Sequence, residues 1–245
     1  MESRVTHSSA DQLMLPGQAG APDGPIDVGT MYVMHFGFRR DLDAFVAAAG
    51  TPVSDRARWH ALRKRWAKFA LVLKHHHGVE DEALWPVLTD RAGAAGDRAA
   101  VETLEAIEAE HGEIDPMLEG CTADLDRLAQ APDEDARAAF EVRVVAFRER
   151  LNRHLAHEET DAMALVQRYL TVEDWKVTEK AANKAATGEY LRFVMPWGRY
   201  GLTAEGREWA RRTTPTAAYV MVTVMEPLLR GSFLKLQRQA FGESS

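Results

Sequence analysis

Two histidine–glutamate pairs in this sequence have the spacing of metal ligands on a helix. His76 precedes Glu80 by four positions, and His154 precedes Glu158 by the same interval. Side chains four residues apart project from one helical face, so each pair can offer an imidazole nitrogen and a carboxylate oxygen to a cation. Both pairs lie within apolar stripes, where an unpaired carboxylate would be costly. The spacing therefore predicts a buried metal site with ligands from two helices.

The first pair stands in a run of three histidines, so its register has an alternative. His77 and Asp81 are also four residues apart. Apolar side chains at three- and four-residue intervals share the face of His76, and the helix around His154 repeats that face, which favours His76 with Glu80. The remaining histidines of this region are then peripheral, and the remaining acids are expected at a solvated edge: His75, His77, His157, Asp81, Glu82 and Glu159.

Two further helices place a histidine in an apolar stripe, at His35 and His111. Asp115 follows His111 by four positions and is a candidate third carboxylate ligand. In the alternative interpretation Asp115 ends the helix together with Pro116, because a residue before proline is driven away from helical geometry.

The types of donor atom limit which metal ions the site can bind. Imidazoles mixed with carboxylates suit iron, manganese or zinc, and the lack of cysteine ligands excludes the usual structural zinc sites. Two carboxylates that can bridge, Glu80 and Glu158, together with four histidines favour two metal ions over one.

Four amphipathic segments must position these side chains. The second is expected over 56–88, with Pro86 loosening or ending its last turn. Residues that favour a helix start precede each segment: Asp27 or Thr30, then Ser54 and Asp55, then Asp97, then Pro132 with Asp133. A shift of 78 residues overlays His76 and Glu80 on His154 and Glu158, which indicates two related hairpins. The pattern predicts an all-α fold, an up-and-down four-helix bundle over 27–169.

The segments on either side of the bundle have a different character. Residues 1–26 are rich in glycine and proline and are expected to form an extended arm. Residues 170–245 are expected to form a C-terminal helical extension, beginning with a capping box of Thr171 and Asp174. Its expected parts are a polar helix over 173–187, an aromatic segment broken by proline over 193–200, a short helix over 203–212 and an apolar element over 217–230. We expect the extension to pack on the bundle or to form a homodimer.

Composition excludes several classes of function. The net charge of -7 argues against nucleic acid as a partner. No apolar run approaches the roughly 18 to 20 residues that a membrane-spanning helix needs, so no membrane partner is expected. The single cysteine, Cys121, fits a reducing compartment, and no secretory signal is recognisable, so we expect a cytoplasmic protein.

Four motifs together resemble the hemerythrin family, specifically its bacterial branch of HHE cation-binding domains. They are His35, His76-x3-Glu80 with Leu84-Trp85-Pro86, Glu110-His111 and His154-x3-Glu158-Glu159, and the likeness spans 28 to about 168. The resemblance implies a non-haem centre of two iron ions, with the four histidines as terminal ligands and Glu80 and Glu158 as bridges. Asp115 stands where an oxygen-carrying hemerythrin would have a second histidine, which argues against simple reversible oxygen carriage.

Three functions follow from this resemblance. The first is a reaction of the reduced centre with a small oxidant (oxygen, peroxide or nitric oxide) in sensing, storage or detoxification. The second is a di-iron oxidase or oxygenase that acts on an organic substrate admitted beside the C-terminal extension. The third is a non-catalytic iron-responsive module. No catalytic residue is assigned in any of them.

Overall fold

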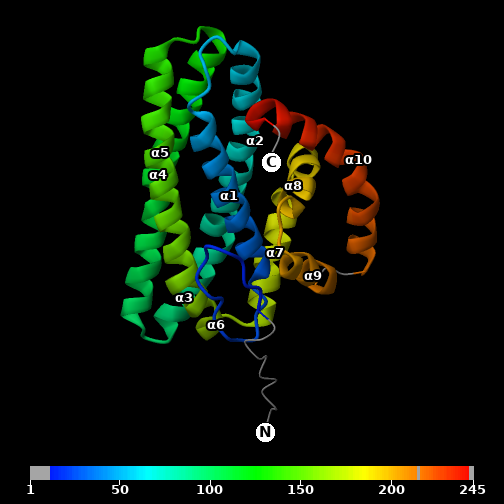
Figure 1. Ribbon diagram of the computed structural model, residues 1–245. Helices are drawn as coiled ribbons and strands as arrows, with labels where there is room; N and C mark the ends of the chain where they lie inside the picture. The colour runs from blue at the N-terminus through cyan, green and yellow to red at the C-terminus, as the bar shows by residue number, and fades with distance from the viewer. Residues whose placement is uncertain (1–11, 214–215, 243–245) are drawn as a thin grey trace.

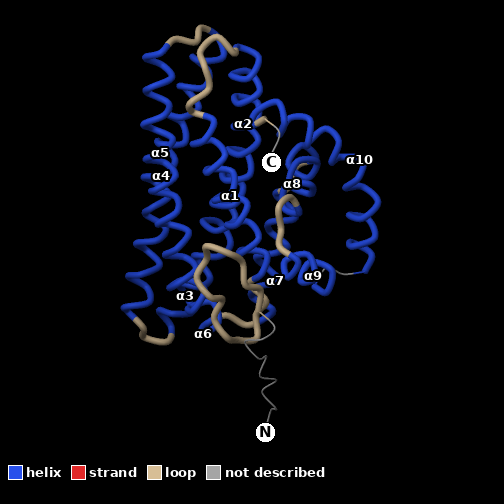
Figure 2. The backbone as a smooth tube through the Cα atoms, in the orientation of Figure 1, coloured by secondary structure: helices blue, strands red, loops and turns tan. Residues whose placement is uncertain are grey.

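Four long helices form the frame of the molecule. The computed structural model describes residues 12–213 and 216–242, without the side chains of 216–223, and the described chain contains helices and loops but no strand (Figure 2). The bundle helices are α1 (Gly29–Ala48), α2 (Arg56–Val79), α4 (Arg98–Gln130) and α5 (Glu134–His157). Figure 1 shows them running up and down beside one another, with α4 and α5 forming one edge. The predicted all-α bundle with a C-terminal helical extension is confirmed.

Aspartates hold the starts of three bundle helices. Asp55, Asp97 and Asp133 each accept a hydrogen bond from the backbone N–H three residues on, which satisfies an otherwise unpaired donor of the first turn. The start of α1 differs, because Val28 stands at its N-cap and Asp27 accepts from Gly29 N at 2.9 Å.

Two of the helices pass through a π-helical turn. η2 (Glu80–Leu84) joins α2 to α3 (Trp85–Ala94), and η3 (Glu158–Ala162) joins α5 to α6 (Met163–Tyr169). Each π turn begins at a glutamate of the predicted site, and such turns often mark functional positions in helices. Of the two outcomes expected for Pro86, a loosened or an ended last turn, the second is wrong, because the chain stays helical to Ala94. Pro86 lies just after the π turn, where Trp85 N bonds to Glu80 O, so its missing N–H falls in the first turn of α3.

A polar layer divides the core of the bundle into two apolar clusters. The larger cluster holds interlocking aromatic rings such as Phe45, Trp66, Phe69 and Phe147. The smaller one lies at the other end of the bundle and includes Tyr32, Leu84, Trp85 and Ile107. On α4, Ile107 belongs to one cluster and Ile114 to the other, with His111 between them. The predicted site therefore lies inside the bundle, with apolar packing on both sides.

The N-terminal segment packs on the bundle within its described part. Leu13, Leu15 and Ile26 are buried in the smaller cluster, whereas Met14 is exposed. Gln12 donates to Ile26 O at 3.0 Å, which closes the segment into a loop against α1. The described part of this segment, 12–28, contains neither helix nor strand and lies against the bundle.

The described part of the C-terminal extension contains four more helices. They are α7 (Val172–Ala185), α8 (Gly188–Arg199), α9 (Ala204–Thr213) and α10 (Thr216–Phe241). The predicted capping box of Thr171 and Asp174 is present at the start of α7. Pro196 and Pro227 lie inside α8 and α10 and interrupt neither, so the expected break in the aromatic segment is wrong.

A buried ion pair between the bundle helices α1 and α2 forms hydrogen bonds with the extension. The Arg65 guanidinium on α2 donates to Asp41 on α1 and to Gln237 Oε1 on α10. Trp197 on α8 donates its indole N–H to the same aspartate at 2.7 Å. Figure 1 shows α7 and α8 along one side of the bundle and α10 arching back over them. No helix in the described part of the chain has the length and apolar character to cross a membrane.

Candidate metal centre

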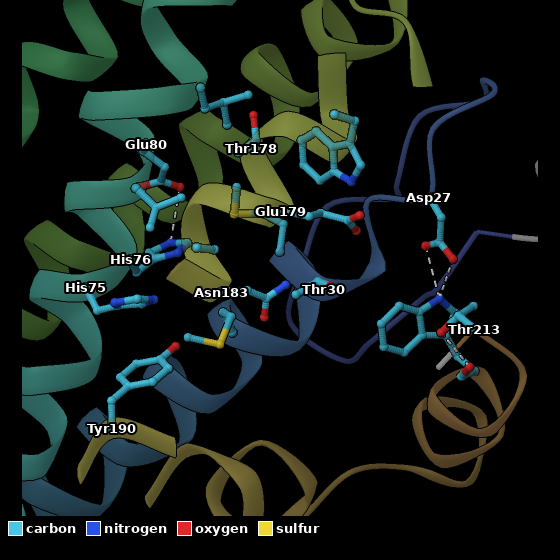
Figure 3. Close-up of a pocket in the computed structure, with 17 residues that line it drawn as sticks. Asp27, Thr30, His75, His76, Glu80, Thr178, Glu179, Asn183, Tyr190 and Thr213 are labelled. Atoms are coloured by element: carbon cyan, nitrogen blue, oxygen red, sulfur yellow. Dashed lines mark hydrogen bonds and ion pairs between the residues drawn. The ribbon is translucent and has the colours of Figure 1, made fainter. Parts of the chain in front are cut away.

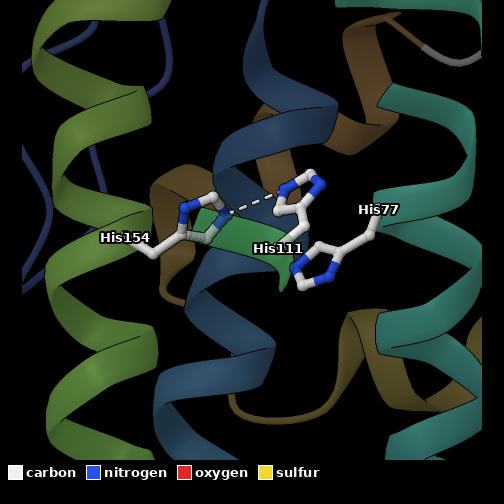
Figure 4. Close-up of side chains that lie close together, drawn as sticks. All are labelled: His77, His111 and His154. Carbon is white, nitrogen blue, oxygen red and sulfur yellow. Dashed lines mark hydrogen bonds between the residues drawn. The ribbon is translucent and has the colours of Figure 1, made fainter. Parts of the chain in front are cut away.

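Seven buried side chains meet in the polar layer as two neighbouring groups. His35, His76, Glu80 and Glu158 form the first group, part of which Figure 3 shows, and their ligand atoms lie within 4.8 Å of one another. His77, His111 and His154 form the second group to the same limit, and their rings converge in Figure 4.

All four bundle helices contribute. His35 comes from α1, His76 and His77 from α2, His111 from α4 and His154 from α5, while Glu80 and Glu158 open the two π turns.

The two carboxylates face both groups. Glu158 places one oxygen 3.3 Å from His35 Nε2 and the other 3.3 Å from His154 Nε2. Glu80 places one oxygen 3.3 Å from His76 Nε2 and the other 3.8 Å from His111 Nε2. Each carboxylate thus spans the two sets of imidazoles, as a carboxylate shared by two cations does.

Most donor atoms of the centre are buried without hydrogen-bond partners, and the exceptions are Nε2 of His111 and of His154, which lie 3.1 Å from each other. Both carboxylate oxygens of Glu80 and Glu158, Nε2 of His35 and His76, and both ring nitrogens of His77 make no hydrogen bond in the described chain. Unpaired buried polar atoms are costly and uncommon in folded proteins. Imidazole and carboxylate donors aimed at one another around a common space fit cations, which would satisfy them.

A second ring of carboxylates orients the imidazoles. His35 Nδ1 lies 2.9 Å from Glu159, His111 Nδ1 lies 2.7 Å from Asp81, and His154 Nδ1 lies 2.8 Å from Glu110. A carboxylate at Nδ1 fixes the proton on that nitrogen and leaves the Nε2 lone pair for the centre, a usual arrangement around ligand histidines.

Burial and neighbouring charges shift the pKa values of the site residues in different directions. Burial and the adjacent imidazoles lower the pKa of His76 and His77 well below the usual value, so both stay neutral, as ligands must be. Burial opposes the charged form of His35 too, but Glu158 and Glu159 raise its pKa overall. Burial and repulsion from Glu158 raise the pKa of Glu80 well above its usual value. Burial would raise the pKa of Glu158 as well, but His154 and His35 hold this pKa well below the usual value of a glutamate.

Glu159 is the most heavily bonded of the outer carboxylates. Besides His35, it accepts hydrogen bonds from Arg39 on α1 and from Gln18 and the Ala19 backbone of the N-terminal segment. It therefore ties a ligand histidine to the segment that covers this end of the bundle.

The structure brings together six of the seven predicted ligands and adds one that was assigned a peripheral role. Asp115 lies outside both groups. Its side chain is 54% exposed and its nearest imidazole contact is His77 Nδ1, at 4.0 Å. The alternative prediction, that Asp115 ends the helix together with Pro116, is wrong, because α4 continues through Pro116. His77, on the neighbouring helix, occupies the second group instead.

The sequence interpretation missed His77 because it assigned one face of α2 to the site. Adjacent residues on a helix point about 100° apart. His76 and His77 can therefore reach toward opposite sides of the space between α1 and α4, and each joins a different group. The four-residue interval between His77 and Asp81 was the available signal, although Asp81 turns out to bond His111 across the helices. Asp81 and Glu159 were both expected at a solvated edge. Glu159 is buried, whereas the Asp81 side chain is 40% exposed, and both accept from histidines of the centre.

A pocket of about 610 Å³ reaches the first group from the side of the extension. His76 and Glu80 form part of its lining, α1 contributes Met31, and α7 and α9 contribute Trp175 and Trp209. Figure 3 shows the two site residues on one side of this space and Asp27 and Thr213 on the other.

Comparison with known families agrees with the geometry of the site. Residues 27–166 match the family model described as the hemerythrin HHE cation binding domain, so the chain belongs to this family. No curated protein and no solved structure matches the chain. The bundle is thus a cation-binding domain, and the buried histidines and glutamates are the residues that could hold the cation.

Proposed function

Because the chain belongs to the hemerythrin HHE family, we propose that it holds two iron ions and reacts with a small oxidant such as oxygen, peroxide or nitric oxide. The observation that carries this proposal is the placement of Glu80 and Glu158, each with one oxygen beside the first group of imidazoles and the other beside the second. Two carboxylates in that position suit a pair of metal ions better than a single one. When bound, ferrous ions would supply the electrons that reduce the oxidant.

The two ions would have unequal protein ligands. With the two carboxylates shared, the first ion would have His35 and His76, and the second would have His77, His111 and His154. The first ion therefore has fewer protein donors and more room for a small molecule. The pocket supports this assignment, because the ligands that it contacts, His76 and Glu80, belong to the first group.

The surrounding residues would control access and orientation. His35, His154 and Glu158 are fully buried, so bulk water has no direct route to their donor atoms. Glu159, Asp81 and Glu110 would hold three imidazoles in the tautomer that presents Nε2. Burial would raise the pKa of Glu159, but His35 and then Arg39 lower it overall, which favours the charged carboxylate.

Metal analysis tests the assignment. We expect two irons per chain after anaerobic reconstitution, and loss of iron in Glu80→Ala and in His154→Ala. His60→Ala serves as a control, because this histidine is exposed on α2 and belongs to neither group. If Glu80→Ala and His154→Ala both keep two irons, the site is wrongly assigned.

Exposure of the anaerobic ferrous protein to oxidants tests the reaction. An absorption band that appears with oxygen and disappears under vacuum would indicate reversible binding. Consumption of peroxide that stops when iron is removed would indicate detoxification. A protein loaded with two irons that responds to none of the three oxidants would contradict this function.

A second candidate function has its own support. The pocket of about 610 Å³ beside His76 has the size of sites that take organic molecules, which a protein reacting only with small oxidants does not need. An oxidase or oxygenase whose substrate enters between the bundle and the extension would use it.

A further inference from the structure

The pocket between the bundle and the extension has an apolar and aromatic floor. Met31, Leu84 and Trp175 are buried residues of its lining, and Tyr190 on α8 closes one side. These side chains come from the metal-binding bundle and from the extension, so the pocket exists only when both are in place. Aromatic walls of this kind bind the apolar body of an organic ligand.

The mouth of the pocket is acidic. Asp27 and Glu179 line it and are exposed to solvent, while none of the described lining residues is a lysine or an arginine. Asp27 is already engaged, because both its oxygens accept from the Trp209 indole N–H at 3.1 and 3.0 Å. Glu179 lies close enough to the Trp175 indole N–H to be stabilised by it, although the contact lacks the geometry of a regular hydrogen bond. Figure 3 places Glu179, Asn183 and Thr30 between the metal-site residues and Asp27.

One buried polar group in the lining also lacks a partner. The Trp175 side chain is only 8% exposed, and its indole N–H makes no hydrogen bond in the described chain. Partial burial and the Asp27 carboxylate raise the pKa of Glu179, while the nearby Trp175 N–H opposes that rise. An unpaired buried donor beside an apolar floor indicates a ligand that carries a hydrogen-bond acceptor as well.

We propose that this pocket binds an organic amine: an aromatic or apolar body on the floor formed by Met31, Leu84 and Trp175, with a protonated amino group held by Glu179 at the mouth. The mouth has two carboxylates, the described lining contains no lysine or arginine, and Lys176, which acts on Glu179, lies outside it, so the lining favours a positive ligand. Trp209 and Tyr190 add aromatic surface to the same lining. The Trp175 indole N–H, which makes no regular hydrogen bond, can donate to an oxygen or nitrogen of the ligand body. This site deepens the second candidate function, on which it rests only for placing the ligand beside iron.

The proposal is tested by calorimetry on the iron-loaded full chain, with the iron content of every sample measured. The probes are 2-phenylethylamine, neutral 2-phenylethanol and anionic 3-phenylpropionate, which share a body and differ in charge. We expect the amine to bind once per chain and more tightly than the alcohol, and the acid to bind least. We also expect the amine to perturb the absorption spectrum of the bound iron, because His76 and Glu80 line the pocket.

Variants on α7 separate the charge from the cavity. Glu179→Gln should weaken amine binding by about tenfold or more, the effect of losing a hydrogen bond to a charged group, and should leave the alcohol unchanged. Glu173→Gln is the matched control, since Glu173 is an exposed acid of the same helix outside the pocket. Ala182→Trp should block the amine and the alcohol alike by filling the space.

Equal affinity for the amine and the acid, or amine binding that survives both Glu179→Gln and Ala182→Trp, would overturn the proposal. If the protein keeps its iron but binds no amine, the amine site is contradicted and the proposed iron site is not. A sample that never binds iron removes the proposed function instead.

Discussion

Glu80 and Glu158 each begin a π-helical turn, and each divides its two carboxylate oxygens between the two groups of histidines. The two residues are related by the 78-residue repeat of the chain, so the local irregularity recurs together with the ligand. A π turn carries an extra residue and changes the direction of the side chains after it. Both helices therefore deliver a carboxylate to the centre and still pack their next residues, such as Leu84 and Met163, in the core.

His77 should be required for the second metal. His77→Ala leaves two imidazoles in the second group, so iron content should fall toward one ion per chain, as measured by elemental analysis. Asp115→Ala should keep the wild-type iron content, because its carboxylate lies outside both groups. The reverse result, with iron lost in Asp115→Ala and kept in His77→Ala, would restore the ligand set expected from the sequence.

Glu159 should tune the site without holding the metal. Glu159→Gln removes the charge that orients His35, so iron affinity should fall by about 10- to 100-fold in competition with a chelator, the usual effect of losing an outer carboxylate. Asp161→Asn is the control, since this carboxylate contacts only His157, which is not in either group. Unchanged affinity in Glu159→Gln would show that the His35 tautomer is fixed by other contacts.

The buried pair of Asp41 and Arg65 should dominate the stability of the junction with the extension. Both side chains are fully buried, so Asp41→Asn should lower the free energy of unfolding by about 3–5 kcal/mol in urea titrations near neutral pH. The exposed pair of Arg63 and Asp126 supplies the control, and Asp126→Asn should cost less than about 1 kcal/mol. Similar losses in the two variants would contradict this role for burial.

The same aspartate predicts how that loss depends on pH. Burial would raise the pKa of Asp41, but the guanidiniums of Arg65 and Arg40 and the Trp197 N–H lower it overall. A carboxyl with a depressed pKa in the folded state stabilises the protein above its unfolded pKa of about 3.9 and loses that contribution as the pH falls through the folded value. The difference between wild type and Asp41→Asn should therefore be full at neutral pH and shrink below about pH 4. A difference that stays constant down to pH 2 would exclude ionised Asp41 as its source.

Gly37 should be essential for docking the extension. A Cβ at this position would lie 2.5 Å from the Trp197 ring, so Gly37→Ala must displace the ring and weaken its bond to Asp41. Trypsin should then cleave the extension faster than in the wild type. Gly112→Ala is the matched control on α4, where the added methyl group meets no atom within 4 Å and should stabilise the helix by about 0.5–1 kcal/mol. Equal cleavage in both variants would show that α8 accommodates the change.

The fold and the two histidine–glutamate pairs could be predicted from the sequence because both depend on helical periodicity. His76 with Glu80 and His154 with Glu158 repeat at an interval that any helix places on one face. The start of α7 could also be predicted, because the capping box that fixes it is formed by two nearby residues, Thr171 and Asp174. Patterns of this kind involve residues within one or two turns of each other.

The rest of the site depends on contacts between helices. Whether Asp81 bonds His77 on its own helix or His111 on the next is decided by helix rotation and by the π turn at Glu80, for which the sequence carried no recognised signal. The contact between Glu110 on α4 and His154 on α5 likewise depends on how the two helices are rotated against each other. The pocket could not be predicted from the sequence, because Met31 and Trp175 are far apart in the chain and meet only when the extension is docked.

That docking has a consequence for how such a chain can change over time. The donor atoms for metal come from 35–158, whereas much of the pocket wall comes from α7, α8 and α9, which follow the bundle as a separate stretch of chain. Substitutions in α7, α8 or α9 would therefore change which ligand enters the pocket without changing the residues proposed to bind metal. A chimera with a different tail on the same bundle would inherit the metal chemistry and acquire a new choice of ligand.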